Sequence, residues 1–238
     1  MRGFLGNAKR SGSAQLIQAA ELPKATKGVW VIPDIINGFP NPSPFYSFND
    51  DSLQKEIMQS LLKEQTSEKH RIAERKPFNL RMFKGELSGA EYLFYLEQQE
   101  AIFAALETTP LPYSGLNRLQ AIQTDIEELV KKGYELKGVL PSTQAYSQYI
   151  NELSLAEKQP HIYLHYLALI YGGQMMKSKV PSSGKMYEFN NMEECIQSIR
   201  RIQSDEWVNE VNKGYDHVIA LFDELENTLF SKKTESYV

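Results

Sequence analysis

Two features of the sequence combine residue types and spacing that could do chemistry. The first is His70, whose expected helix face is made by positions three and four residues apart: Met58, Leu62, Thr66, His70 and Ala73. An imidazole on that face points inward or into a cleft, where its neutral form can ligate a metal ion. A hydrogen-bonded histidine of the core or its boundary fits the same spacing.

The second feature is the pair Gly172–Gly173 inside an expected helix. Each glycine costs about 1 kcal/mol relative to alanine in a helix interior, so the pair costs about 2 kcal/mol. Close approach of another helix or of a flat ligand would explain it, and so would a simple break or bend. An imidazole on one helix with a flexible, glycine-containing helix across from it would form an iron-binding face and a lid for a planar macrocycle. That arrangement suits haem.

The elements that must position these residues are helices. Helical periodicity begins after the N-cap types of residues 49–52, and it recurs between glycine and proline breaks. Further helices are expected at about residues 92–106, 116–132, 142–155, 160–177, 192–203 and 205–230. No alternation typical of strands competes with this pattern, so the predicted fold class is all-α.

The two ends of the chain differ from this helical part. Residues 24–44 contain several prolines and glycines and one β-branched run, Val29 to Ile32, which predicts an irregular segment with one short strand. The sequence therefore predicts an N-terminal irregular arm at residues 1–49, a helical domain at 50–230 and a short tail at 231–238.

Composition narrows the classes of function. With 238 residues, 42% hydrophobic and 24% charged, the chain suits one globular domain. The net charge is -4, from 26 basic and 30 acidic residues, so the protein has no positive electrostatic field to attract nucleic acid. No nucleic acid is therefore expected as a partner. The longest apolar stretch, around residues 163–171, is too short to cross a bilayer, so no membrane span is expected.

Two observations bear on the compartment. The single cysteine, Cys195, cannot form an intramolecular disulfide, which favours the cytoplasm. The alternative is organellar, because residues 1–20 carry Arg2, Lys9 and Arg10 without an acid and resemble a transit peptide weakly.

Ordered motifs over residues 53–225 resemble the haem oxygenases. Around His70 the matching residues are Lys63–Glu64, Ala73–Glu74, Phe78 and Lys84–Gly85; farther along they are Ala105–Leu106–Glu107, Tyr163, Tyr166–Leu167 and Gly172–Gly173–Gln174. The resemblance implies an all-α, haem-oxygenase-like multi-helix bundle that binds haem (heme b, with its iron). It makes His70 the axial iron ligand and places Gly172 and Gly173 over the haem.

The resemblance also implies partners for the haem propionates. Lys63 and Tyr163 match the family's propionate-binding residues directly. Arg200 and Arg201 fall in the matching late helix without perfect register, so either or both could pair with a carboxylate. A solvated helix face is the alternative for these two arginines.

The sequence departs from the family at the pair that orders distal water. Many members have glycine then aspartate four and three positions before the glycine pair, where this chain has Ala168 and Leu169. The resemblance places both residues among those that bind the haem, with Ala168 adding a methyl group where the haem approaches closely. Leucine cannot hydrogen-bond, and positioned proton transfer is worth about 10²–10⁴ in rate. His165, one turn earlier, could organise the water instead, or it could be a structural histidine that faces solvent.

The function that follows from the resemblance is oxidative cleavage of haem to biliverdin, carbon monoxide and iron. It requires O2 and an external electron donor, a reductase or ferredoxin. A non-catalytic haem-binding protein for storage, delivery or sensing is the alternative, and a haem-free helical interaction protein is a third possibility.

Overall fold

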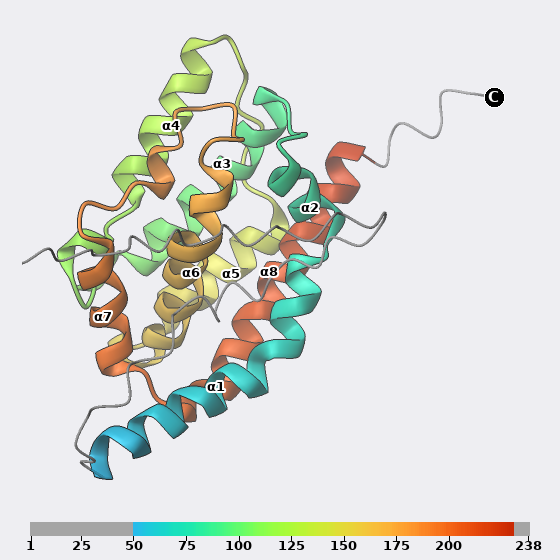
Figure 1. Ribbon diagram of the computed structural model, residues 1–238. Coiled ribbons are helices and arrows are strands. Elements are labelled where there is room, and N and C mark those ends of the chain that lie inside the picture. The colour runs from blue at the N-terminus through green and yellow to red at the C-terminus, as the bar shows by residue number, and fades with distance from the viewer. Residues whose placement is uncertain (1–49, 231–238) are drawn as a thin grey trace, which may run out of the picture. The chain divides into compact units, whose positions relative to one another are not determined.

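The computed structural model describes residues 50–230, with side chains from residue 61 onward (Figure 1). The α-helices are α1 (Asp50–Glu74), α2 (Pro77–Lys84), α3 (Gly89–Leu106), α4 (Leu119–Lys131), α5 (Pro141–Glu152), α6 (Leu155–Met176), α7 (Met192–Ile202) and α8 (Val208–Phe230). Short 3-10 helices are η2 (Ser114–Leu116), η3 (Lys185–Tyr187) and η4 (Asp205–Trp207). No strand occurs between residues 50 and 230, which confirms the all-α prediction. The expected arm, its strand at 29–32 and the tail at 231–238 lie outside the described residues.

Local sequence signals set where the helices begin. Ser88 and Glu91 form a capping box at the start of α3, and Ser154 and Glu157 form another at the start of α6. Helix α6 therefore begins at Leu155, and the expectation that it begins at Pro160 is wrong. Pro160 lies inside the helix, because the capping box begins the helix at Leu155, before the proline is reached.

Helix α2 is a short element that periodicity alone does not separate from its surroundings. Pro77 occupies its first turn, where the missing amide proton costs nothing. Phe78 and Met82 face inward and are buried, and Gly85 ends the helix in the left-handed conformation with φ 74°. The break between α1 and α2 fixes where the His70 helix stops.

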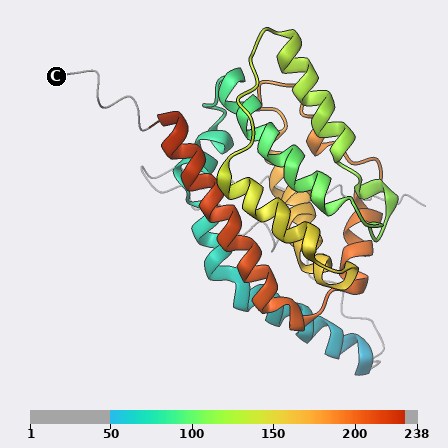
Figure 2. The same ribbon diagram turned by 180° about the vertical axis from the view of Figure 1, so that it is seen from behind.

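Helix α8 is the element on which the two candidate site helices converge. It packs against α1, α2, α5 and α6, whereas α1 and α6 have little direct contact with each other. On the other side, α3 packs against α4 and α5, and Figure 2 shows α3, α5 and α8 next to one another. The helices that carry His70 and the glycine pair are thus held apart by shared neighbours.

The core confirms the inward face expected around His70. Leu62, Thr66 and Ala73 are buried, as their spacing predicts, while the side chain of Met58 lies outside the described part of α1. Cys195 is a buried free thiol. In residues 50–230 no helix has the length and apolar character to span a membrane.

Candidate functional site

His70 sits at the boundary of the core, near the C-terminal end of α1. A quarter of its side chain is exposed, and its Nε2 atom lies 3.3 Å from Oε1 of Glu74, one turn later. Its ring also packs beside Tyr215 of α8, with ring centroids 5.8 Å apart. A partly exposed imidazole that a carboxylate orients can offer one ring nitrogen to a metal ion while the other is hydrogen-bonded.

Tyr215 connects His70 to α6. Burial raises the pKa of the Tyr215 hydroxyl, and the neighbouring Tyr163 and Glu74 raise it further. Tyr163 is itself buried on α6 and packs edge-on against Trp207 of η4, at 6.2 Å between centroids. Tyr215 of α8 therefore packs against His70 of α1 and lies within the electrostatic influence of Tyr163 of α6.

The structure separates the two candidate arginines. The guanidinium of Arg200 lies 5.8 Å from the ring centre of Tyr163 and also bonds to Gln203. Arg201 instead forms an ion pair with Glu194 and is more than half exposed. Arg200 is thus brought to Tyr163, and Arg201 is not.

Lys63 lies on the same helix as His70, seven residues earlier in the sequence and therefore two turns away on nearly the same face. Its side chain is partly buried. Lys63 and His70 therefore lie on nearly the same face of α1, separated by two helical turns.

One face of α6 changes from buried to open along its length. Ala168 is exposed, Gly172 follows it by one turn, and Met175 is 39% exposed. A Cβ atom added at Gly172 would meet nothing within 4 Å. These three residues form an open strip of small side chains that ends in a thioether.

Leu169 does not belong to this open strip. Its side chain is only 5% exposed and contributes to the hydrophobic core. Of the two residues that replace the family's polar pair, Ala168 is the one that faces outward.

The two glycines of the pair have different surroundings. A Cβ atom at Gly173 would lie 2.3 Å from Cδ1 of Tyr187, so this position requires glycine for the close approach of η3. Gln174 donates to the carbonyl oxygen of Tyr187 at 2.7 Å, which holds η3 against α6. Gly173 therefore allows η3 to pack closely against α6, whereas Gly172 leaves open space beside the helix.

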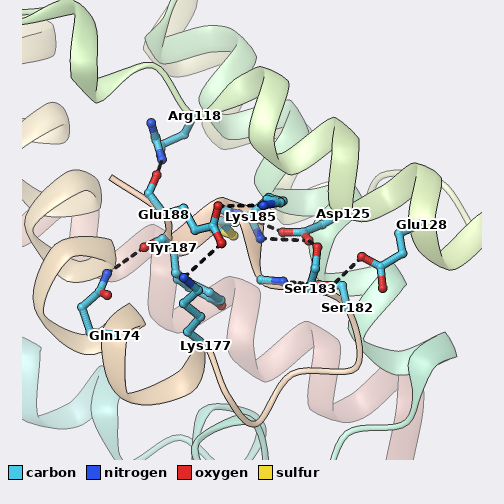
Figure 3. Close-up of polar contacts among 12 residues, drawn as sticks. Arg118, Asp125, Glu128, Gln174, Lys177, Ser182, Ser183, Lys185, Tyr187 and Glu188 are labelled. Carbon is cyan, nitrogen blue, oxygen red and sulfur yellow. Dashed lines mark hydrogen bonds and ion pairs between the residues drawn. The ribbon is translucent and has the colours of Figure 1, made fainter. Parts of the chain in front are cut away.

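Polar contacts with α4 hold the same η3 segment from its other side, as Figure 3 shows. The Asp125 carboxylate accepts from the backbone amides of Lys185 at 3.0 Å and Met186 at 2.8 Å. Glu188 pairs with both Lys177 and Lys185. These contacts fix the chain that leaves α6, and with it the ring of Tyr187.

His165 is buried, so the alternative of a solvent-facing histidine is wrong. Its Nε2 atom lies 2.9 Å from the hydroxyl of Tyr146 on α5, and Phe103 of α3 meets its ring edge-on. Burial, with His161 and His217 nearby, lowers the pKa of His165 to about 3. The imidazole is therefore neutral near pH 7.

Sequence reasoning missed several residues of this region. Tyr215, Trp207, Tyr146 and Glu210 come from helices whose packing the sequence does not specify. The spacing of His161 and His165, one helical turn apart, was the available signal for the buried cluster.

Comparison with known proteins identifies the family. The family model described as Heme oxygenase matches residues 57–208, more than half of the chain. The chain belongs to the haem oxygenase family. Its match to Heme oxygenase 1 of Gallus gallus is 27% identical over 165 residues, covering 59% of this chain and 55% of that protein. Its match to Heme oxygenase 1, chloroplastic, of Arabidopsis thaliana is 32% identical over 112 residues, covering 41% of this chain and 39% of the relative.

Solved haem oxygenase structures share the fold. Heme oxygenase-1 from the cyanobacterium Synechocystis sp. PCC6803, solved in complex with heme, aligns with a TM-score of 0.61 and 20% identity, covering 73% of this chain and 94% of that one. The enzyme from Leptospira interrogans aligns with a TM-score of 0.58 and 21% identity, covering 69% and 98%. The haem oxygenase fold is thus present almost in full, although the chain spans only about half, or less, of the two curated relatives described above.

Proposed function

We propose that this protein is a haem oxygenase that binds haem (heme b) against α1 and α6 and opens the ring to biliverdin, carbon monoxide and iron. One observation carries the proposal: His70 of α1 packs beside Tyr215 of α8, and Tyr163 of α6 is near enough to raise the pKa of the same hydroxyl. The residues that the family resemblance assigns to the iron and to a propionate thus come together from distant parts of the chain. Membership of the family supports the same activity.

The residues present suit a flat, iron-containing ring. His70 is partly exposed and lies beside Glu74, so it would be able to hold the iron through one ring nitrogen. The open strip of α6 offers Ala168 and Gly172, and nothing within 4 Å would meet even an added Cβ atom at Gly172. A planar ligand can therefore approach the backbone of α6 closely at this point.

When bound, haem supplies the iron that takes up O2 and the ring carbon that is oxidised. His70 would hold the iron through one ring nitrogen, and Glu74 would accept a hydrogen bond from the other. Tyr163 and Arg200 would bind a propionate, since they are already neighbours, and Lys63 would contribute a second positive charge from α1. Arg201 is assigned no role here, because it pairs with Glu194.

The reaction also requires O2, protons and an external electron donor, which we propose is a reductase or a ferredoxin. Leu169 cannot hold the water that delivers protons, since its side chain is apolar and buried. His165 is the polar side chain one turn before it on α6 and is our candidate for that task.

We propose a cytoplasmic location, which the single cysteine supports, with an organelle as the alternative. Expression of the full chain with a C-terminal fluorescent protein distinguishes the two. Diffuse fluorescence supports the cytoplasm, and fluorescence confined to an organelle contradicts it.

Titration of the purified protein with haemin tests the proposal. The wild type should bind about one haemin per chain with a histidine-ligated Soret spectrum, and addition of a reductant in air should convert the complex to biliverdin. His70→Ala should lose that spectrum, whereas His217→Gln, which removes another partly buried imidazole, should keep it. Unchanged spectra in His70→Ala would overturn the ligand assignment. Stable binding without biliverdin would support a haem carrier instead.

A further inference from the structure

A buried chain of hydrogen-bonding side chains runs through α5, α6 and α8, and the proposed haem contacts do not use it. The Tyr146 hydroxyl lies 2.9 Å from Nε2 of His165 and 2.8 Å from Nδ1 of His161. His161 continues the chain, with its Nε2 atom 3.0 Å from Oε1 of Glu210. His161 is fully buried, and the side chain of Glu210 is 29% exposed. The chain thus connects a buried position on α6 with the protein surface.

The carboxylate at the outer end determines the direction of every hydrogen bond in the chain. Burial opposes ionisation of Glu210, but hydrogen bonds from Tyr149 and His161 keep its pKa below the usual value, so it is a carboxylate near pH 7. A carboxylate can only accept, so His161 must donate from Nε2. Burial lowers the pKa of His161, so its ring is neutral and its Nδ1 atom is an acceptor.

The remaining two bonds follow from that assignment. Tyr146 has a single proton, which it must donate to the Nδ1 acceptor of His161. Its oxygen then accepts a proton from Nε2 of His165. A neutral His165 with its proton on Nε2 has a lone pair on Nδ1, so the inner end of the chain is a hydrogen-bond acceptor. Among residues 61–230, no side chain bonds to that Nδ1 atom.

Close packing prevents the rings of the chain from turning. A Cβ atom at Gly214 of α8 would lie 3.1 Å from Nδ1 of His161 and 2.7 Å from a methyl carbon of Leu164, so α8 approaches the chain at this glycine. His217 stacks on Tyr146 with ring centroids 4.4 Å apart. Packing thus holds the rings of His161 and Tyr146 in place, while the carboxylate of Glu210 sets the order of donors and acceptors.

The inner end of the chain lies on the face of α6 that continues into the open strip. Ala168 and Gly172 follow His165 by three and seven residues, so the three residues share one face. Leu169, which offers no hydrogen-bonding group, lies one turn from His165. An acceptor on His165 thus offers, one turn earlier on this helix, the hydrogen-bonding group that Leu169 lacks.

We propose that Glu210 acts through His161 and Tyr146 to hold His165 with Nδ1 as the acceptor for a water molecule at the haem face of α6. The water would donate one hydrogen to His165 and direct the other toward the site. Glu210, His161 and Tyr146 are positioning residues in this scheme, and His165 is the residue that holds the water. The role of the water rests on the proposed function, whereas the tautomer of His165 does not.

Long-range proton–nitrogen NMR spectra of the haem-free protein test the chain directly. We expect both His161 and His165 to carry their proton on Nε2. Glu210→Gln removes the carboxylate, and a glutamine amide can donate or accept, so the population of the Nδ1–H tautomer of His165 should rise by about fivefold. Tyr146→Phe should remove the bias as well. Tyr149→Phe is the matched control, because it deletes a hydroxyl that bonds to Glu210 without interrupting the chain.

Two results would overturn the inference. A wild-type His165 protonated on Nδ1 contradicts the order of donors and acceptors, and an unchanged tautomer in Glu210→Gln contradicts control by the carboxylate. Glu210 is partly exposed, so this variant tests the chain even if Tyr146→Phe fails to fold.

The rate of biliverdin formation by the haem complex provides a second test. Biliverdin formation should slow by about tenfold or more in Glu210→Gln relative to Tyr149→Phe, with haemin affinity unchanged. Equal rates in the two variants would overturn the water-holding role. Failure of the wild type to bind haemin would overturn the proposed function and the role of the water, while the tautomer result would stand.

Discussion

The two halves of one face of α6 are occupied in different ways. Toward the N-terminus, His161 and His165 are buried, and both bond to Tyr146. Toward the C-terminus the same face continues as Ala168 and Gly172, which leave open space. In the N-terminal half, large rings pack against the neighbouring helices. In the C-terminal half, small side chains leave the helix surface uncovered, so side-chain size decides where a flat ligand can approach α6.

Leu169 lies near the boundary between the two halves and provides the largest expected effect. Leu169→Asp places a carboxylate in the core without a partner, which should lower the free energy of unfolding by about 2–5 kcal/mol. Ala168→Asp is the matched control at an exposed position and should cost less than about 1 kcal/mol. Urea unfolding followed by circular dichroism measures both.

Two outcomes at Leu169 would contradict this account. Equal losses of stability in Leu169→Asp and Ala168→Asp would mean that Leu169 is not buried. Faster biliverdin formation by Leu169→Asp than by the wild type would mean that His165 does not supply the water site.

Gly172 and Gly173 test the same contrast between open and packed positions at two consecutive residues. Gly173→Ala should destabilise the fold by roughly 1–3 kcal/mol, because its methyl group meets Tyr187. Gly172→Ala should leave stability unchanged or raise it by up to about 1 kcal/mol, since alanine favours the helix. It should nevertheless weaken haemin binding. Thermal unfolding and haemin titration of both variants check this, and the reverse order of stabilities would refute the division of roles.

Acid should destabilise the buried half of the α6 face. The pKa of His165 falls from 6.5 unfolded to about 3 folded, so the unfolded chain binds a proton first as pH drops. The contribution of His165 to the free energy of unfolding is fully present above about pH 6.5. It falls by about 1.4 kcal/mol per pH unit between pH 6.5 and 3. Burial lowers the pKa values of His161 and His217 too, which adds to the decline in the same direction.

The groups that face this cluster include charged residues of α8 as well as the histidines. They are Glu210, Lys213 and Asp216 from α8, and Tyr146 and Tyr149 from α5. Urea unfolding at several pH values, for wild type and His165→Gln, isolates the contribution of one ring. The variant should lose stability less steeply with acid, and parallel curves would contradict a buried neutral His165.

The two arginines of α7 should differ from each other in their effect on haemin binding. Arg200→Gln should weaken haemin binding by up to about 3 kcal/mol, the value of a charge-assisted hydrogen bond, because Arg200 lies beside Tyr163. Arg201→Gln should change it by less than about 1 kcal/mol, since Arg201 forms an exposed ion pair with Glu194. Fluorescence quenching by haemin measures both, and a larger effect at Arg201 would reverse the assignment.

Much of the fold could be predicted because helix signals are local. The buried face of Leu62, Thr66 and Ala73 follows from periodicity alone. The start of α6 was misplaced at Pro160, because the capping box of Ser154 and Glu157 begins the helix before the proline.

The candidate site was predictable only in part. Motif order pointed to His70 and Tyr163, which are distant in sequence. Tyr215 was not predictable, because it joins them through the packing of α8 between α1 and α6. The same holds for Glu210, whose influence on His165 passes through three helices.

The iron ligand is the central claim, and chemical rescue tests it most directly. His70→Gly should remove the histidine-ligated Soret spectrum of the haemin complex, and free imidazole should restore it by occupying the space of the missing side chain. A spectrum that is unchanged in His70→Gly, and indifferent to imidazole, would contradict ligation of the iron by His70.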